Sequence, residues 1–362
     1  MQNNQAIPFN KENFKQIFSR KFAVVIIASI PGALLADYFN VPLAWFLGPM
    51  IITSLITLGG IQTQMPKLLL SIVLILLGLY IGNYVDKSLF SQIHQWAWTS
   101  LIMLGYIIIS VLLVSKYLQK FSGYEKKTSI FSAAPGALGP LLILAEDEKS
   151  DLSRVATSHL IRLIIIITVF PFVVDSFYNT EEIIIAETIV QNQNINDLLL
   201  LVILSVLFIV IFDKIRIPAA LLSGTLVASG FLQITEIASY KLPPDIINYC
   251  LLILGSSVGC RFANKTFNEI AKNALHSFIA TFILVILGLM AAIVAGFVID
   301  KNFFTLLLSY CPGGIYEVAV IAIFFDLDPE FVSFHHIIRL LMILFFVPVF
   351  LKLISKKSTP NS

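Results

Sequence analysis

Long runs of apolar residues, each close to the length of a membrane-crossing helix, constrain this chain most. Examples are residues 100–114, 198–212 and 276–299. A hydrocarbon core of about 30 Å is crossed by roughly 20 apolar residues in an α-helix, whereas a transmembrane barrel would show short alternating strands. With 57% hydrophobic and 13% charged residues, the chain is also far from the composition of a soluble domain. The sequence therefore predicts an all-α integral membrane protein.

Charge and cysteine content exclude several other classes. The formal net charge of +2 is too small to indicate a nucleic-acid partner. Cys250, Cys260 and Cys311 lie in or beside apolar segments without CxxC spacing, so they predict neither a disulfide framework nor a zinc site. We expect them to be packing residues.

An internal duplication organises the chain. Residues 66–171 align without a gap on residues 243–348, an offset of 177 that pairs Pro, Gly, His and Arg as well as aliphatic residues. Upstream the offset is 176 and pairs Gly48 with Gly224. The predicted organisation is an N-terminal segment at 1–21, a membrane repeat at 22–175, an acidic external linker at 176–196, a second repeat at 197–352 and a tail at 353–362.

Each repeat contains five candidate spans and one interrupted apolar segment. The interrupted segments, 126–148 and 302–326, are split by Pro-Gly into arms of roughly ten residues, a length typical of re-entrant pieces rather than spans. The predicted spans lie near 22–39, 43–60, 67–84, 96–117 and 153–175, and near 198–213, 217–234, 245–262, 273–299 and 330–351.

The distribution of Lys and Arg indicates how the repeats are oriented. If both interrupted segments are re-entrant, 19 of the 24 Lys and Arg fall on the side of the two termini, whereas residues 176–197 hold four acids and no Lys or Arg. This pattern fits the positive-inside rule with cytoplasmic termini. Five spans per repeat make the repeats inverted; six full crossings per repeat would make them parallel. We expect two inverted repeats, each with about five transmembrane helices and one re-entrant hairpin.

The Pro-Gly breaks predict a site. Main-chain groups freed by a break cannot face lipid, so non-helical chain at membrane depth survives only inside protein or beside a watery cavity. Secondary transporters pair broken helices from inverted repeats near the midplane. The predicted tips are Pro135 and Gly136 in the first hairpin, and Pro312, Gly313 and Gly314 in the second. The alternative is that Pro and Gly are simply more frequent in membrane helices.

Each repeat also carries a His and an Arg three residues apart, on one face of a helix. Arg162 and Arg339 lie about ten residues into their predicted spans, close to the midplane at 1.5 Å per residue. Intramembrane ionisable residues are costly and mark functional sites. A guanidinium favours a carboxylate or phosphate partner, and His159 and His336 are candidates for proton exchange. Alternatively, each Arg pairs with Glu317 or with hairpin carbonyls and serves only to hold the repeats together.

Glu317 is the one acid placed within a hairpin tip, and its repeat counterpart is Pro140. Three roles are open to it: carrying a coupling proton, coordinating Na⁺, or neutralising an arginine. His335 and His336 are adjacent, but neighbouring helical residues point about 100° apart and no third ligand lies at metal spacing, so no metal site is expected.

The stretch PGGIYE, followed by DLDPEFVSFHHIIRLLMILFFVP, resembles the AbrB membrane-protein family. That family carries a duplicated module with a Pro-Gly-Gly-x-x-Glu hairpin and a later His-x-x-Arg helix. The first repeat resembles the same module as AAPGALGPLLILAEDEKSDLSRVATSHLIRL. There Ala137 and Pro140 replace the second Gly and the Glu, which argues against a mechanism with two acids.

Members of that family carry labels such as ammonia monooxygenase or regulator of another gene's expression. The resemblance implies one of these roles and supplies no catalytic residues. A monooxygenase needs a clustered metal site, which the spacing of the five histidines does not provide. Direct regulation through DNA needs a soluble module, yet the longest polar stretch is 176–197. We therefore expect no enzyme, no cofactor and, for regulation, an indirect route.

The leading interpretation is a secondary transporter in the cytoplasmic membrane that moves a small organic anion or amino acid with H⁺ or Na⁺. Its expected partners are the lipid bilayer and a small anionic or zwitterionic solute, with no nucleic acid, and assembly into a homo-oligomer is compatible with this class. The alternative is a membrane sensor or accessory protein without net transport. A transporter would offer water alternating access to the tips, whereas a sensor would copurify with a partner.

Overall fold

The computed structural model describes residues 11–85, 87, 89–136, 138–177, 194–238, 240, 242–243, 245–263 and 265–356. Most of the predicted acidic linker and parts of both terminal segments lie outside these ranges. Helices and turns make up the described residues, with no strand among them, so the all-α prediction is confirmed.

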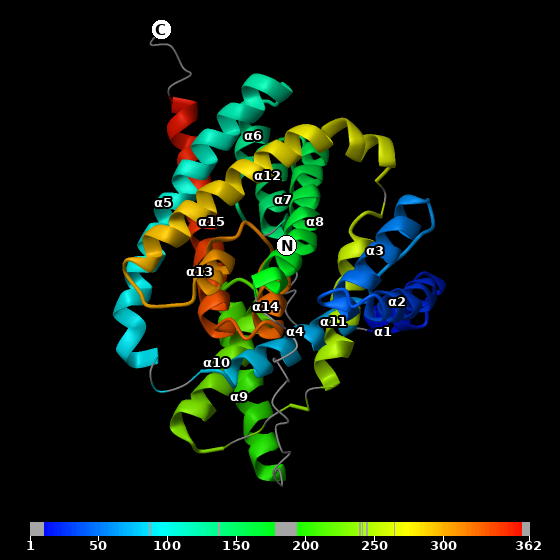
Figure 1. Cartoon of the computed structure of the whole chain (residues 1–362), viewed down its shortest axis with the longest axis vertical. Coiled ribbons are helices and arrows are strands. Elements are labelled where there is room, and N and C mark those ends of the chain that lie inside the picture. Colours follow the sequence, from blue (N-terminus) through cyan, green and yellow to red (C-terminus); the bar gives the residue numbers. More distant parts are fainter. Residues whose placement is uncertain are drawn as a thin grey trace. The chain divides into compact units, whose positions relative to one another are not determined.

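The helices (Figure 1) are α1 Lys11–Ile17, α2 Arg20–Tyr38, α3 Ala44–Leu58, α4 Lys67–Gly82, α5 Leu89–Ser122, α6 Lys126–Ala133, α7 Leu138–Asp147, α8 Leu152–Phe177, α9 Ile195–Lys214, α10 Ala220–Thr235, α11 Asp245–Cys260, α12 Phe267–Gly296, α13 Phe303–Tyr310, α14 Ile315–Phe324 and α15 Pro329–Lys356.

A helix occurs at each of the ten predicted spans, and six of these helices are long and apolar enough to cross a membrane: α2, α5, α8, α9, α12 and α15. The chain is therefore a multi-pass membrane protein. The remaining four, α3, α4, α10 and α11, have 15 or 16 residues. At 1.5 Å per residue they are about 24 Å long, shorter than a typical hydrocarbon core. Ten crossings thus stay a prediction.

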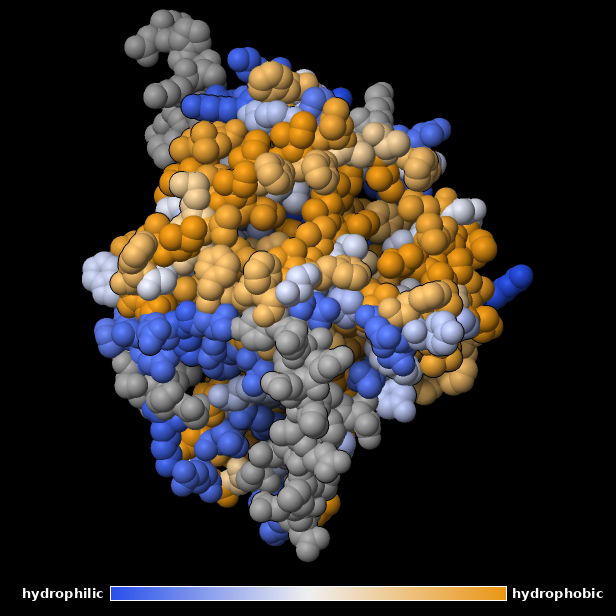
Figure 2. All heavy atoms as spheres, in the orientation of Figure 1, coloured by the Kyte–Doolittle hydropathy of each residue, from blue (hydrophilic) through white to orange (hydrophobic). Residues whose placement is uncertain are grey.

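Apolar side chains point outward along α12. Leu275, Phe278, Phe282, Ile286 and Met290 recur every three or four residues, on one face of the helix, and are 40–66% exposed. Figure 2 shows the surface over α12 as predominantly hydrophobic. A stripe of this kind would be costly in water and suits contact with lipid.

The chain divides into two compact units, and each contains corresponding helices from both repeats. One, which we call the span unit, holds α2, α3 and α4 with their counterparts α9, α10 and α11. The other, which we call the hairpin unit, holds all of α6, α7, α12 and α13, nearly all of α5 and α15, most of α8 and part of α14.

In the span unit the two repeats pack against each other reciprocally. α3 packs on α11, and α4 packs on α10. A Cβ added at Gly78 would lie 2.4 Å from the carbonyl oxygen of Leu222, and one at Gly255 would lie 2.1 Å from that of Phe46. Gly255 is the repeat counterpart of Gly78, and Leu222 that of Phe46. The same close approach therefore occurs twice, as expected of an approximate two-fold relation built on small interfacial residues.

Buried hydroxyls join three helices of the span unit. Ser29 Oγ in α2 lies 2.6 Å from Ser256 Oγ in α11 and 3.2 Å from Thr53 Oγ1 in α3. All three side chains are inaccessible to solvent. Apolar surface outside and hydroxyl bonds inside is the arrangement that holds helices together in a bilayer.

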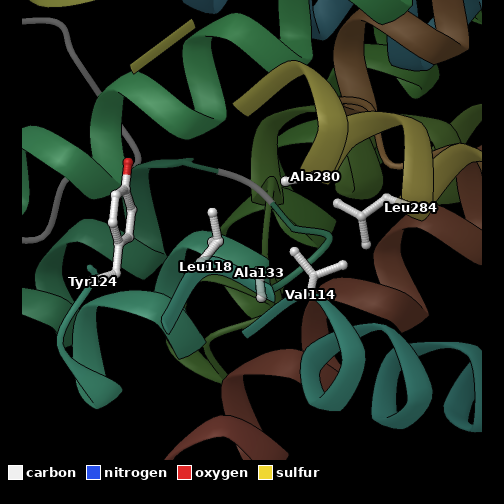
Figure 3. Close-up of a cluster of buried hydrophobic side chains, with 6 residues drawn as sticks. All are labelled: Val114, Leu118, Tyr124, Ala133, Ala280 and Leu284. Carbon is white, nitrogen blue, oxygen red and sulfur yellow. The ribbon is translucent and has the colours of Figure 1, made fainter. Parts of the chain in front are cut away.

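In the hairpin unit the end of α6 is buried by two long helices. Ala133, the last residue of α6, lies in a cluster with Val114 and Leu118 of α5 and with Ala280 and Leu284 of α12 (Figure 3). The point at which the first interrupted segment leaves helical geometry is therefore held in a packed apolar environment.

Candidate functional site

Both interrupted segments consist of two short helices separated by a non-helical turn at the predicted Pro-Gly. The residue before each proline ends the first helix: Ala134 has φ −61° and ψ 125°, and Cys311 has φ −59° and ψ 132°. A following proline disfavours helical geometry at these positions. Pro135, Gly136, Pro312 and Gly313 are buried, and Gly314 is half-buried.

His159 and Arg162 of α8 bind the end of α6. His159 Nε2 donates to the carbonyl oxygen of Phe131 over 2.9 Å. Arg162 Nη1 donates to that of Ala134 over 2.8 Å, and Arg162 Nη2 donates to Ser132. The helix spacing of three residues puts both side chains on the same α6 terminus.

His336 and Arg339 of α15 repeat this arrangement at the end of α13. His336 Nε2 lies 3.0 Å from the carbonyl oxygen of Leu308, the counterpart of Phe131. Arg339 Nη1 donates to Cys311, the counterpart of Ala134. Its Nη2 donates to Gly313 over 2.6 Å and also bonds to His336 Nδ1 at 3.0 Å.

Each arginine therefore acts as a charged cap on a buried half-helix. The last carbonyls of a helix lack intrahelical partners and carry a partial negative charge, which a cation stabilises. Of the two interpretations that the sequence leaves open, the contacts of the Nη atoms match the one with hairpin carbonyls as partners. Binding of a solute by either arginine remains a prediction.

Both guanidinium groups keep one further donor. Nε of Arg162 and Nε of Arg339 have no hydrogen-bond partner among the described residues, although both side chains are only 2% exposed. Leaving a buried donor unsatisfied costs about 1–3 kcal/mol. The hydroxyl of Tyr106, in α5, interacts electrostatically with both arginines, and the charges of Arg162 and Arg339 repel each other. The two Nε donors have the chemistry to bind an anionic group.

The two Pro-Gly turns, at the predicted tips, pack on each other's arginine helix. A Cβ at Gly136 would lie 2.9 Å from Ile343 Cδ1, and one at Gly313 would lie 3.3 Å from Ile166 Cγ2. Ile166 and Ile343 are repeat counterparts, each one helical turn beyond its Arg. Each tip is thus capped by the Arg of its own repeat and packed against the long helix of the other.

Glu317 lies in the first turn of α14 and is 1% exposed. Its carboxylate folds back over the glycine that precedes the helix, because a Cβ at Gly314 would lie 2.0 Å from Oε2. A side chain at position 314 would therefore collide with the acid. The first repeat has Ala137 and Pro140 at the corresponding positions, so both members of the pair differ there together.

His335 joins a second buried network, which the sequence did not indicate beyond its position next to His336. Its Nδ1 donates to the carbonyl oxygen of Phe331 over 2.9 Å, and its Nε2 lies 2.8 Å from Thr99 Oγ1. The Tyr310 hydroxyl donates to the Thr99 carbonyl over 2.7 Å. His335 thus ties α15 to α5 beside α13. In the part of the chain that the structure describes, no three His, Cys, Asp or Glu residues are grouped to hold a metal ion.

Tyr106 is the member of the site that sequence reasoning missed. Its repeat counterpart is Ile283, so the duplication that marks the His and Arg pairs gives no signal there. A tyrosine inside a membrane helix is also an ordinary core residue by type.

Comparison with known proteins gives a family. The model of the family described as "Transition state regulatory protein AbrB" matches residues 2–88 and 61–355. "Putative regulator AbrB" of Escherichia coli (strain K12) is 24% identical over 327 residues, covering 89% of this chain and 93% of that protein. "Uncharacterized protein YhjN" of Bacillus subtilis (strain 168) is 20% identical over 356 residues, covering 91% and 92%. No solved structure matches. The chain, a multi-pass membrane protein with a duplicated module, belongs to the AbrB family.

Proposed function

We propose that this protein is a secondary transporter that moves a small organic anion or amino acid across the cytoplasmic membrane, coupled to H⁺ or Na⁺. One observation carries the proposal: two Pro-Gly turns from different repeats lie in one compact unit, each capped by a buried arginine whose Nε has no partner in the part of the chain that the structure describes. Non-helical chain at membrane depth is typical of the sites of secondary transporters, where half-helix ends bind solute or ion.

The residues take distinct roles in this proposal. The tips Pro135, Gly136, Pro312, Gly313 and Gly314 form the turns that line the solute site. Nε of Arg162 and of Arg339 would donate to the anionic group, since guanidinium prefers carboxylate or phosphate oxygens. Glu317, His159 and His336 are the candidates for coupling.

The proposal includes inverted repeats with re-entrant hairpins and cytoplasmic termini, because an odd number of spans per repeat gives the charge distribution that the positive-inside rule favours. It assigns no catalytic reaction and no resident metal or cofactor. The spacing of the histidines supports neither.

Accessibility of the two tips to water tests the proposal. Cys311 is itself a tip residue, and its repeat counterpart is Ala134. Replacing Cys250 and Cys260 by Ser leaves Cys311 as the single cysteine, and Ala134→Cys in a cysteine-free background gives the matched position. Labelling by a membrane-impermeant maleimide would be measured from each side of oriented vesicles, with and without Na⁺ and at two pH values.

We expect both cysteines to react from both sides, at rates that change with pH, Na⁺ or added anion. A cysteine at Ala280, buried between α5 and α12, is the control that stays protected. If both tips stay closed from both sides under every condition, the Pro-Gly turns are structural and transport is refuted.

A regulatory role is the second candidate, because the family description and the E. coli relative's name both refer to regulation. In a membrane protein of this kind it would be indirect, through a partner that carries the output. Affinity purification from membranes under mild detergent separates the two: a stoichiometric partner favours the sensor, and solute flux in liposomes made with the purified protein alone favours the transporter.

A further inference from the structure

The carbonyl groups at the ends of the two broken helices are already bound by cations of the protein itself. In transporters with discontinuous helices, carbonyls at unwound turns and half-helix C-termini coordinate the coupling ion. Here Ser132 and Ala134 accept from Arg162, and Cys311 and Gly313 accept from Arg339.

Unlike a bound ion, the guanidinium groups of Arg162 and Arg339 cannot diffuse away from these carbonyls. A guanidinium stays protonated in proteins, and both side chains are covalently fixed on long helices and almost fully buried. Unlike a dissolved ion, a side chain brings its charge to the carbonyls at any ion concentration.

The charge balance of the hairpin unit also disfavours an added cation. The buried charged side chains among its described residues are Arg162, Arg339 and Glu317, that is, two cations and one acid. A bound Na⁺ would increase the excess of positive charge in a medium of low dielectric, where unbalanced charge is most costly.

We propose that Arg162 and Arg339 occupy the two positions at which a coupling Na⁺ would bind, so that the protein works without Na⁺. The inference rests on the proposed function and narrows its coupling ion to the proton. Removal of either arginine takes the cation away from a pair of main-chain carbonyls and creates a site that Na⁺ can fill. The carbonyl of Ala134 keeps its bond from the Gly136 N–H, so there Na⁺ would share the oxygen.

Thermal unfolding of the purified full-length protein tests this directly. Tryptophan fluorescence would be recorded in NaCl, KCl and choline chloride at equal ionic strength. For the wild type we expect the same Tm in all three salts. For Arg162→Ser and Arg339→Ser we expect NaCl to raise Tm by about 2 °C over choline chloride, the shift produced in a chain of 362 residues when a ligand is present at roughly ten times its Kd.

Two variants serve as controls. Arg339→Lys keeps an ammonium at the carbonyls of Cys311 and Gly313, so its Tm should not depend on Na⁺. Arg154→Ser removes an exposed arginine that donates to the carbonyl of Gly123 over 3.1 Å, and it should show no Na⁺ effect either, because water can satisfy that carbonyl.

The inference is overturned if Na⁺ saturably stabilises the wild type, or if a folded serine variant shows no response specific to Na⁺. Where a serine variant does not fold, binding of radioactive sodium to the wild type decides: saturable binding refutes the inference and its absence supports it. These readouts need no flux. A failure of transport in liposomes therefore refutes the proposed function while leaving the result on the arginines intact. Saturable Na⁺ binding by the wild type refutes the inference on the arginines while leaving the proposed function intact.

Discussion

The guanidinium group of Arg339 donates a hydrogen bond to Nδ1 of His336 over 3.0 Å. Because a guanidinium has no acceptor, Nδ1 must be the unprotonated ring nitrogen. The proton is then on Nε2, which donates to the Leu308 carbonyl. The two neighbours thus fix one neutral tautomer, and a proton that reached Nδ1 would break the bond to Arg339.

His336 should therefore matter more for stability than its repeat counterpart. His336→Phe removes both bonds and leaves the Leu308 carbonyl with the Cys311 main-chain N–H as its remaining donor, so we expect it to lower the free energy of unfolding by about 2–4 kcal/mol. His159→Phe is the matched variant, since His159 interacts with the main chain of Phe131 and Gly136 but, in the described part of the chain, makes no bond to Arg162. It should cost less, because Arg162 keeps all of its bonds. Thermal unfolding of both variants measures the difference, and an equal loss would contradict the assigned tautomer.

Close packing of the repeats in the span unit gives a second prediction. Gly78→Ala and Gly255→Ala each place a Cβ against a main-chain carbonyl, which cannot move aside as a side chain does. Each should destabilise the protein by about 1–3 kcal/mol. Gly105→Ala, in α5, meets open space and should be neutral or slightly stabilising. Thermal unfolding of the three variants checks this, and tolerance of both Gly78→Ala and Gly255→Ala would rule out the close approach.

Packing of the first tip on the second repeat predicts a specific pairwise coupling. Gly136→Ala brings its Cβ against Cδ1 of Ile343, and Ile343→Val removes that methyl group. The double variant should therefore be more stable than the sum of the two single effects, by about 0.5–1 kcal/mol.

Ile166→Val, at the counterpart position, is the control: with Gly136→Ala its effect should be additive. Unfolding of the three single and two double variants completes the two cycles. Coupling to Ile166 in place of Ile343 would mean that each tip packs on the helix of its own repeat.

Much of the local structure could be predicted from the sequence because it depends on local rules. Pro135 and Pro312 disfavour helix at the residue before them, so both breaks lie where the sequence puts them. The spacing of His159 and Arg162 fixes a shared helix face. The left-handed starts of two short helices could not be predicted. Leu43 and its counterpart Ala219 precede α3 and α10 with φ of 53° and 56°, and neither is a glycine that would indicate this geometry.

The contacts between repeats could not be predicted in this way. Gly136 and Ile343 are far apart in the chain, and only the packing of α8, α15 and the turns brings them together. Nor does an arginine's presence say which oxygen it binds, since a carboxylate and a carbonyl are both acceptors. For Arg162 and Arg339 the choice of carbonyls follows from the position of each helix end, which is a property of the tertiary structure.

The pairing of Gly314 with Glu317 gives the last prediction. Gly314→Ala would put a Cβ 2.0 Å from Oε2 of Glu317, so the carboxylate must leave its place at the start of α14. We expect a loss of about 1–3 kcal/mol. Glu317→Ala removes the obstacle, and in that background Gly314→Ala should cost almost nothing, as in the first repeat, where Ala137 occurs with Pro140.

A double-mutant cycle by thermal unfolding measures this coupling, and solute uptake by the same variants tests the role of the acid. Gly139→Ala, in α7, is the control for adding a methyl group beside a tip, since a Cβ there meets nothing within 4 Å. If the only role of Gly314 is to leave room for the Glu317 carboxylate, Gly314→Ala and Glu317→Ala should reduce uptake equally, and the double variant should reduce it no further. Independent effects of the two changes would show that Gly314 is required for the turn itself, whatever the position of the carboxylate.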